Sequence, residues 1–199
     1  MERLQGQMTK EIGNRLTNSV AVVHPDVTVF YDHGRSGDHN VCQPTTYMGR
    51  RYGADATLSG VDIVAVKDRK VIVVVEIEEG GFRPKTMLGD VFGVALADSM
   101  HIQGDRYVIE DAVIVIAVVH DGKGKKGEKC GRLERHLARY FLRQPSRSVS
   151  TIRVLPCSSE DIVRRIERLV RLELSKRKRR ETSSSRTPPR TLRRVPRRK

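Results

Sequence analysis

Three carboxylates lie close together in the middle of the chain and could share one site. Glu76 and Glu78 end an apolar, β-branched run of residues 71 to 78. Asp62 lies in a similar run, residues 61 to 66. Alternate residues of a strand share a face, and the short connection between the runs can bring Asp62 beside the glutamates. Two unit charges about 4 Å apart repel by roughly 4 kcal/mol at an effective dielectric near 20, so we expect this cluster to hold a proton or a cation.

A divalent metal ion is the productive partner for such a cluster. Mg²⁺ prefers carboxylate and carbonyl oxygens, so Asp62, Glu76 and the Ile77 carbonyl are the candidate ligands for Mg²⁺ or Mn²⁺. A bound ion would lower the pKa of a water molecule and neutralise charge on a phosphate under attack. The pattern therefore indicates a nuclease. The alternative interpretation is a solvated strand end, because acids also terminate edge strands without chemistry.

Hydrophobic periodicity predicts an α/β fold in the order αβββαβαβα. The predicted elements are helix 9 to 23, strands 27 to 31, 61 to 66 and 71 to 78, helix 84 to 100, strand 112 to 119, helix 133 to 141, strand 151 to 155 and helix 162 to 172. Residues 32 to 59 are polar and without period, which is typical of a long functional or mobile loop.

This order of elements, with acids at these places, resembles the PD-(D/E)xK nuclease superfamily of restriction enzymes, junction resolvases and repair nucleases. The resemblance covers about residues 7 to 119. It implies a restriction-endonuclease-like mixed sheet flanked by helices, with an αβββαβ core to which this chain adds a C-terminal αβα unit. It also implies Mg²⁺-dependent hydrolysis of DNA phosphodiesters, and a homodimer is compatible with it.

The resemblance assigns roles to particular residues. Asp62 corresponds to the first acid of the motif, Glu76 to the second, and Glu78 to the position of the lysine. Some restriction endonucleases of the superfamily carry Glu at that position, so this ExE variant is compatible with cleavage. Lys85, near the start of the next helix, is a candidate for a migrated lysine; a surface lysine is the alternative. Glu11 corresponds to the acid of the first helix.

Two of these acidic positions also have plain structural interpretations. Glu11 lies four residues before Arg15, and an ion pair at that spacing accounts for it without chemistry. Asp90, on the helix after Glu76, is interpreted as a solvated helix residue rather than a ligand.

The net charge of +14 is concentrated at the C-terminal end. Residues 176 to 199 hold 12 Lys or Arg and one acid. We expect a folded domain over residues 1 to 174 and a disordered basic tail over 175 to 199, which would neutralise phosphates without reading sequence. A solubility element or a nuclear address are the alternatives for this tail. The candidate nucleic-acid-binding residues are Arg50, Arg51, Lys123, Lys125, Lys126, Lys176, Arg177, Lys178, Arg179 and Arg180.

The remaining composition predicts an intracellular protein. Three widely spaced cysteines argue against a disulfide framework, and no apolar run has the length of a membrane span. The polar N-terminal residues do not resemble a signal peptide. We expect a cytoplasmic location, or a nuclear one in a eukaryote or its virus. The competing functions are a noncatalytic nucleic-acid-binding protein and a structural or assembly protein.

Overall fold

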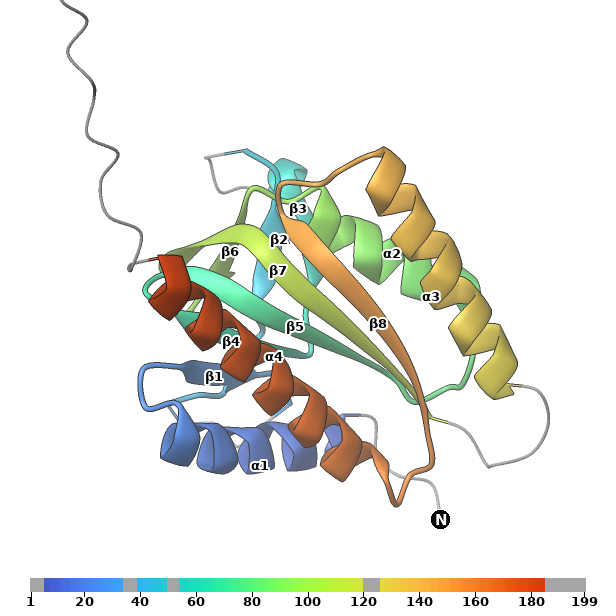
Figure 1. Ribbon diagram of the computed structural model, residues 1–199, viewed down its shortest axis with the longest axis horizontal. Helices are drawn as coiled ribbons and strands as arrows, with labels where there is room; N and C mark the ends of the chain where they lie inside the picture. Colours follow the sequence, from blue (N-terminus) through green and yellow to red (C-terminus); the bar gives the residue numbers. More distant parts are fainter. Residues whose placement is uncertain (1–5, 34–38, 50–53, 120–125, 185–199) are drawn as a thin grey trace, which may run out of the picture.

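The computed structural model describes residues 6 to 33, 39 to 49, 54 to 119 and 126 to 184. The protein has an α/β fold in which helices cover both faces of one open, mixed sheet (Figure 1). The four described helices are α1 (Gln7–Val23), α2 (Pro84–Ala95), α3 (Lys126–Arg143) and α4 (Ile162–Ser184). The eight strands are β1 (Thr28–Tyr31), β2 (Thr45–Tyr47), β3 (Thr57–Gly60), β4 (Ile63–Lys67), β5 (Lys70–Glu78), β6 (Ser99–Ile102), β7 (Asp105–Val119) and β8 (Val149–Cys157).

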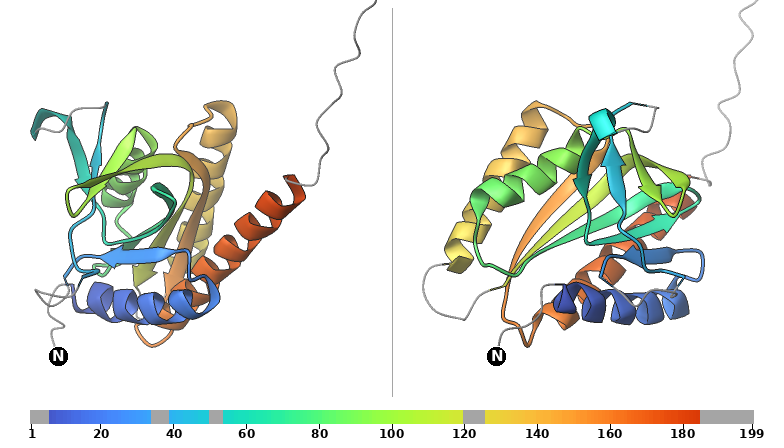
Figure 2. Two further views of the ribbon diagram at one scale, coloured as in Figure 1. Left: turned by 90° about the vertical axis from the view of Figure 1, so that its left-hand side faces the viewer. Right: turned by 180° about the vertical axis from the view of Figure 1, so that it is seen from behind.

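The sheet has the order β1-β4-β5-β7-β6-β2-β3, and β8 also pairs with β7. Strands β5, β7 and β8 run parallel to one another, whereas the other neighbours are antiparallel. One edge of β7 pairs with β5, and the other pairs first with β6 and then with β8. Asp111, with a φ of 54°, lies where β7 changes partner. Strands β2 and β3 consequently lie at the end of the molecule far from α1 (Figure 2).

Two hydrophobic cores hold the helices on the sheet. One core joins α1 and α4 to one face, and the other joins α2 and α3 to the opposite face. Ile12 of α1 and Ile166 of α4 are completely buried on the first face, as are Met87 and Val91 of α2 on the second. Burying each such side chain stabilises the fold by about 1.5 to 3 kcal/mol.

Strand β5 is apolar where both faces are covered and becomes acidic where that cover ends. Val71 through Val75 are buried without alternation, as expected of a central strand. After Glu78 the chain turns at Gly81, whose φ of 86° suits glycine, and α2 begins with Pro84. The acidic end of β5 therefore faces the first turns of α2.

Several predicted boundaries were wrong for identifiable reasons. The helix expected to reach about Met100 ends at Ala95, and Met100 instead belongs to β6, where it is buried against the sheet. Its spacing of four from Leu96 imitates a helical repeat. Strand β7 begins at Asp105 rather than at residue 112. Its first half was missed in the prediction because that half is largely polar. Residues 32 to 59, predicted as a loop, contain β2 and all but the last residue of β3.

The predicted disorder of residues 175 to 199 was wrong for the first ten of them. Helix α4 continues to Ser184. Arg and Lys are good helix formers, and the side chain of Lys176 is held by an ion pair of 2.6 Å with Glu173 one turn earlier. Residues 185 to 199 lie outside the described part of the chain.

Candidate active site

The candidate site lies where β4 begins and β5 ends. The antiparallel register pairs Ile63 with Val75, so Asp62, just before β4, lies opposite Glu76. Strand alternation places Glu76 and Glu78 on the face that carries Val74, which is the face covered by α2. The structure thus brings all three predicted acids to one end of one sheet.

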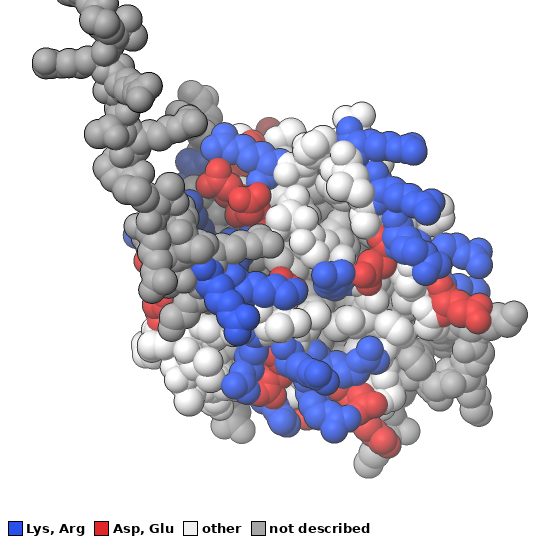
Figure 3. All heavy atoms as spheres, viewed as in Figure 1, with Lys and Arg blue, Asp and Glu red and all other residues white. Residues whose placement is uncertain are grey.

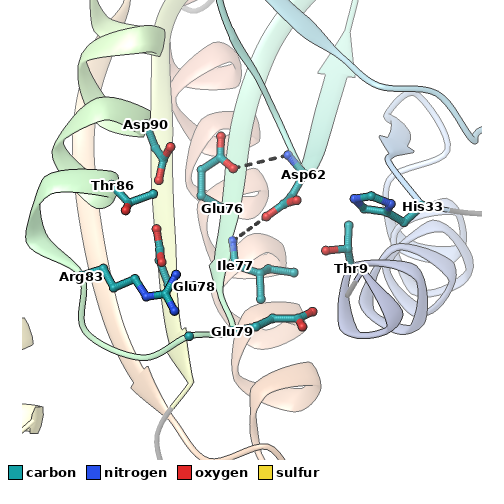
Figure 4. Close-up of a pocket in the computed structure, with 12 residues that line it drawn as sticks. Thr9, His33, Asp62, Glu76, Ile77, Glu78, Glu79, Arg83, Thr86 and Asp90 are labelled. Carbon is teal, nitrogen blue, oxygen red and sulfur yellow. Dashed lines mark hydrogen bonds between the residues drawn. The ribbon is translucent and has the colours of Figure 1, made fainter. Parts of the chain in front are cut away.

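Two hydrogen bonds join the strands at this point. The main-chain N–H of Ile77 donates to Oδ2 of Asp62 at 2.7 Å, and the main-chain N–H of Asp62 donates to Oε2 of Glu76 at 3.4 Å (Figure 4). Asp62 accepts a hydrogen bond from β5, which carries Glu76, and Glu76 accepts one from the main chain of Asp62. The loop before β4 and the end of β5 are therefore held together by the candidate residues themselves.

Glu76 is the most deeply buried of these acids. Only 6% of its surface is exposed, and its Oε1 has no hydrogen-bond partner among the described residues. Burial raises the pKa of Glu76 well above its usual value, and the negative charges of Asp62 and Asp90 raise it further. An unsatisfied buried carboxylate oxygen costs free energy, so this position favours a proton or a cation.

The acidic cluster also contains Glu79, just after β5, and Asp90 of α2, which was interpreted wrongly from the sequence as a solvated helix residue. Asp90 lies beside Glu78 (Figure 4), and its negative charge raises the pKa of Glu78. Asp90 lies three residues after Met87 and four before Val94, both fully buried against the sheet. That helical spacing would have placed Asp90 on the inner face of α2.

The pKa values of the acids reflect burial and mutual repulsion. Burial, together with the charge of Asp90, raises the pKa of Glu78 to about 7, although the charge of Arg83 opposes the shift. Burial raises the pKa of Asp62 to about 6, although the Ile77 hydrogen bond and the charge of His33 lower it. The pKa of Asp90 is also raised by burial.

These acids line a pocket of about 830 Å³ between the end of β5, the start of α2 and the start of α1 (Figure 4). Thr9 of α1 and His33 close one side, and Arg83 and Thr86 close the other. Among the described residues that line it, Arg83 is the one Lys or Arg. Its guanidinium group lies against Gly80, where a side chain would collide with it.

Two predicted catalytic residues lie away from this pocket. Glu11 is exposed on the outer side of α1, and the pocket wall is formed by Thr9 instead. The ion pair suggested for Glu11 and Arg15 is also absent from the described structure, because Arg15 pairs with Glu167 of α4 at 2.9 Å. Lys85 is exposed on α2 and does not line the pocket, and the cation beside Glu78 is Arg83.

The predicted metal ligands meet, but in a hydrogen-bonded arrangement. Within the described ranges, no three His, Cys, Asp or Glu side chains are arranged to hold a metal ion. Asp62 is turned toward the Ile77 N–H, and Glu78 toward Asp90. The Ile77 carbonyl accepts the N–H of Glu79 at 3.1 Å and keeps a second lone pair. The oxygen-rich donor set and the unpartnered Oε1 of Glu76 are the features that suit a hard cation.

The predicted nucleic-acid-binding residues are divided between described and undescribed segments. Arg50, Arg51, Lys123 and Lys125 lie outside the described residues. The other predicted positions lie in helices: Lys126 is the first residue of α3, and Lys176, Arg177, Lys178, Arg179 and Arg180 belong to α4.

Comparisons with known proteins identify no relative. No family model, no curated protein and no solved structure matches the chain. Among the helices of the described residues, none is long and apolar enough to cross a membrane.

Proposed function

We propose that this protein is a Mg²⁺- or Mn²⁺-dependent nuclease of the PD-(D/E)xK type that hydrolyses phosphodiester bonds of DNA. The observation that carries the proposal is the buried Glu76, which lines an acidic pocket opposite Asp62 and whose Oε1 has no hydrogen-bond partner among the described residues. A structural acid at a strand end would be exposed or fully hydrogen-bonded. Glu76 is neither.

Different residues of the pocket can bind the ion, bind the phosphate and accept a proton during hydrolysis. Asp62, Glu76 and the Ile77 carbonyl would hold the ion, which supplies an acidified water and neutralises phosphate charge when bound. Arg83 can donate hydrogen bonds to a phosphate oxygen in the same pocket. Glu78, with a pKa of about 7, can accept a proton from water near neutral pH.

The arrangement of elements supports the same proposal at the level of the fold. Strands β1, β4 and β5 follow α1, and β7 follows α2, which reproduces the αβββαβ order when β2, β3 and β6 are regarded as additions. We infer a restriction-endonuclease-like sheet on this basis. Fold similarity alone does not establish an activity, so the argument for cleavage depends on the pocket.

One observation favours a second candidate, a noncatalytic nucleic-acid-binding protein that keeps this fold. Glu78 stands at the lysine position of the motif, and burial together with the charge of Asp90 raises its pKa. A pocket that keeps its acids protonated would bind neither metal nor substrate phosphate strongly. The two candidates differ in whether the purified protein cuts DNA.

A pair of matched substitutions tests the proposal. Glu76→Gln removes a proposed ligand, and Glu11→Gln makes the same chemical change at an exposed position outside the pocket. Both variants and the parent are incubated with supercoiled plasmid and branched DNA in Mg²⁺ or Mn²⁺. Even hydrogen-bond partners of metal ligands contribute about 10- to 100-fold, so we expect Glu76→Gln to lose about 100-fold or more. We expect Glu11→Gln to cut like the parent.

The outcomes separate the candidates. Equal activity of Glu76→Gln and the parent would show that the pocket is not the active site. An inactive parent on every substrate and with both ions would favour the noncatalytic alternative.

A further inference from the structure

The exposed face of α3 carries a row of cations. Its inner side is formed by Cys130 and Leu137, which are buried against the sheet. The outer side presents Lys129, Arg132, Arg135, Arg139 and Arg143, all of them exposed. Their spacing of three or four residues aligns them along one side of the helix. We call these five residues the α3 basic row.

Within the described residues, the α3 basic row differs from the basic surface of α4 in its ion pairing. On and around α4, Arg164 pairs with Asp161 at 2.8 Å, and both Arg15 and Arg171 pair with Glu167. None of the five cations of the row forms an ion pair with any residue in the described ranges. Glu134, the acid on the inner side of α3, is engaged by Arg153 of β8.

The row also lies next to the helix that forms one wall of the acidic pocket. Tyr140 of α3 packs edge-on against Phe92 of α2, with ring centroids 5.6 Å apart. Phe92 follows Asp90 by two residues, so the two side chains leave α2 on nearly opposite sides. Helix α2 therefore lies between the pocket and α3. Figure 3 shows Lys and Arg side chains following α3, with acids beside them toward its lower end, and Lys and Arg mixed with acids over α4.

We infer that the α3 basic row binds the phosphate backbone of duplex DNA and positions it beside the pocket. This inference rests on the proposed nuclease function. From Lys129 to Arg143 the helix rises about 21 Å, which matches about six phosphates at 3.4 Å of rise per strand. Unpaired guanidinium groups contact phosphates without reading base sequence, so the row provides affinity and orientation but no sequence specificity.

Two charge-matched triple variants test this inference. The first replaces Arg132, Arg135 and Arg139 of the row with Gln. The second replaces Arg164, Arg168 and Arg171 of α4 with Gln and removes the same charge. Affinity for a 20-base-pair duplex is measured by fluorescence anisotropy in EDTA at several salt concentrations, so that no cleavage takes place.

We expect only the α3 triple variant to change the salt dependence. Removing three cations that bind phosphates should flatten the slope of log affinity against log salt by about 2.7, because each neutralised phosphate on duplex DNA contributes about 0.9. When the salt concentration rises from 50 to 200 mM, the parent should therefore lose about 40 times more affinity than the α3 triple variant. Replacing the same three residues with Lys should restore the parent slope. Circular dichroism should show unchanged thermal unfolding, because these side chains are exposed.

The inference is overturned if the α3 triple variant keeps the parent slope, or if the α4 triple variant flattens it equally, which would indicate a response to overall charge. Tighter binding to single-stranded than to duplex DNA would overturn the assignment to duplex. Failure of the nuclease proposal has a different signature: the parent would not cut plasmid, yet the α3 effect on binding in EDTA would persist.

Discussion

Oδ2 of Asp62 accepts the main-chain N–H of Ile77 at 2.7 Å, so the first acid of the candidate site also completes the hydrogen bonding of the neighbouring strand. The carboxylate therefore has a structural role that needs only an acceptor oxygen, and a proposed chemical role that needs its charge. Substitutions at this position can separate the two.

We predict that Asp62→Asn and Asp62→Ala both abolish cleavage but differ in stability. Asn retains an acceptor oxygen for the Ile77 N–H. Ala leaves this N–H without the acceptor at position 62 and should lower the free energy of unfolding by about 1 to 2 kcal/mol. Urea denaturation of both variants, combined with a plasmid assay, measures the two effects. Cleavage by Asp62→Asn at the rate of the parent would remove Asp62 from the set of ligands.

The raised pKa values predict how stability depends on pH without divalent ions. The pKa of Glu78 rises from its ordinary 4.5 to about 7 on folding, and that of Asp62 from 3.8 to about 6. The folded state therefore binds these protons more tightly than the unfolded state. The resulting stabilisation is fully present below about pH 4 and is lost as the pH rises through about 6 to 7.

Glu78→Gln should weaken this pH dependence, because it removes one of the titrating groups. In EDTA at pH 8 we expect this variant to be more stable than the parent by an amount on the order of 1 kcal/mol. Urea denaturation between pH 4 and 8 measures the effect, and Glu11→Gln is the control that should follow the parent. A parent whose stability rises between pH 5 and 8 would contradict the raised pKa values.

Two truncations test the boundary between α4 and the basic segment that follows it. Ending the chain after Ser184 removes seven Lys or Arg and leaves the described fold intact, so thermal stability should be unchanged. If the segment binds DNA, the salt slope should flatten by about 0.9 for each phosphate that the segment neutralises.

Ending the chain after Leu174 should in addition destabilise the fold. Glu173, only 7% exposed, would lose the ammonium group of Lys176. The side chain of Lys176 is partly solvated, which limits the expected loss to about 1 kcal/mol. Lys176→Met in the full chain should reproduce it, as measured by urea denaturation. Equal stability of the two truncated proteins would show that the part of α4 after Leu174 does not stabilise the fold.

The site residues that could be located from the sequence are those whose positions follow from the periodicity of strands and helices. Strand alternation and the short β4–β5 connection were sufficient to bring Asp62, Glu76 and Glu78 to one sheet end, as observed. Asp90 could have been found from its helical spacing to Met87. Glu11 was placed by analogy with a family motif, and the burial of Met8, Thr9 and Ile12 turns it outward instead.

Other features depend on long-range pairing that no local pattern records. The first half of β7 is polar, and it is a strand because β5 and β6 pair with its two edges. Strands β2 and β3 have three and four residues and exist only through pairing with each other and with β6. Arg83 enters the pocket because the turn after β5 directs it back over Gly80, which depends on backbone geometry rather than on residue type.

The central claim, that the acidic pocket binds a divalent ion through Glu76, is tested most directly by isothermal titration calorimetry with Mn²⁺ at pH 8, where Glu78 and Asp62 have lost their protons. We predict one saturable site per chain in the parent and in Glu11→Gln. In Glu76→Gln the affinity should fall by about 10-fold or more. Binding of equal strength in Glu76→Gln and the parent, or no saturable binding by the parent, would contradict the account.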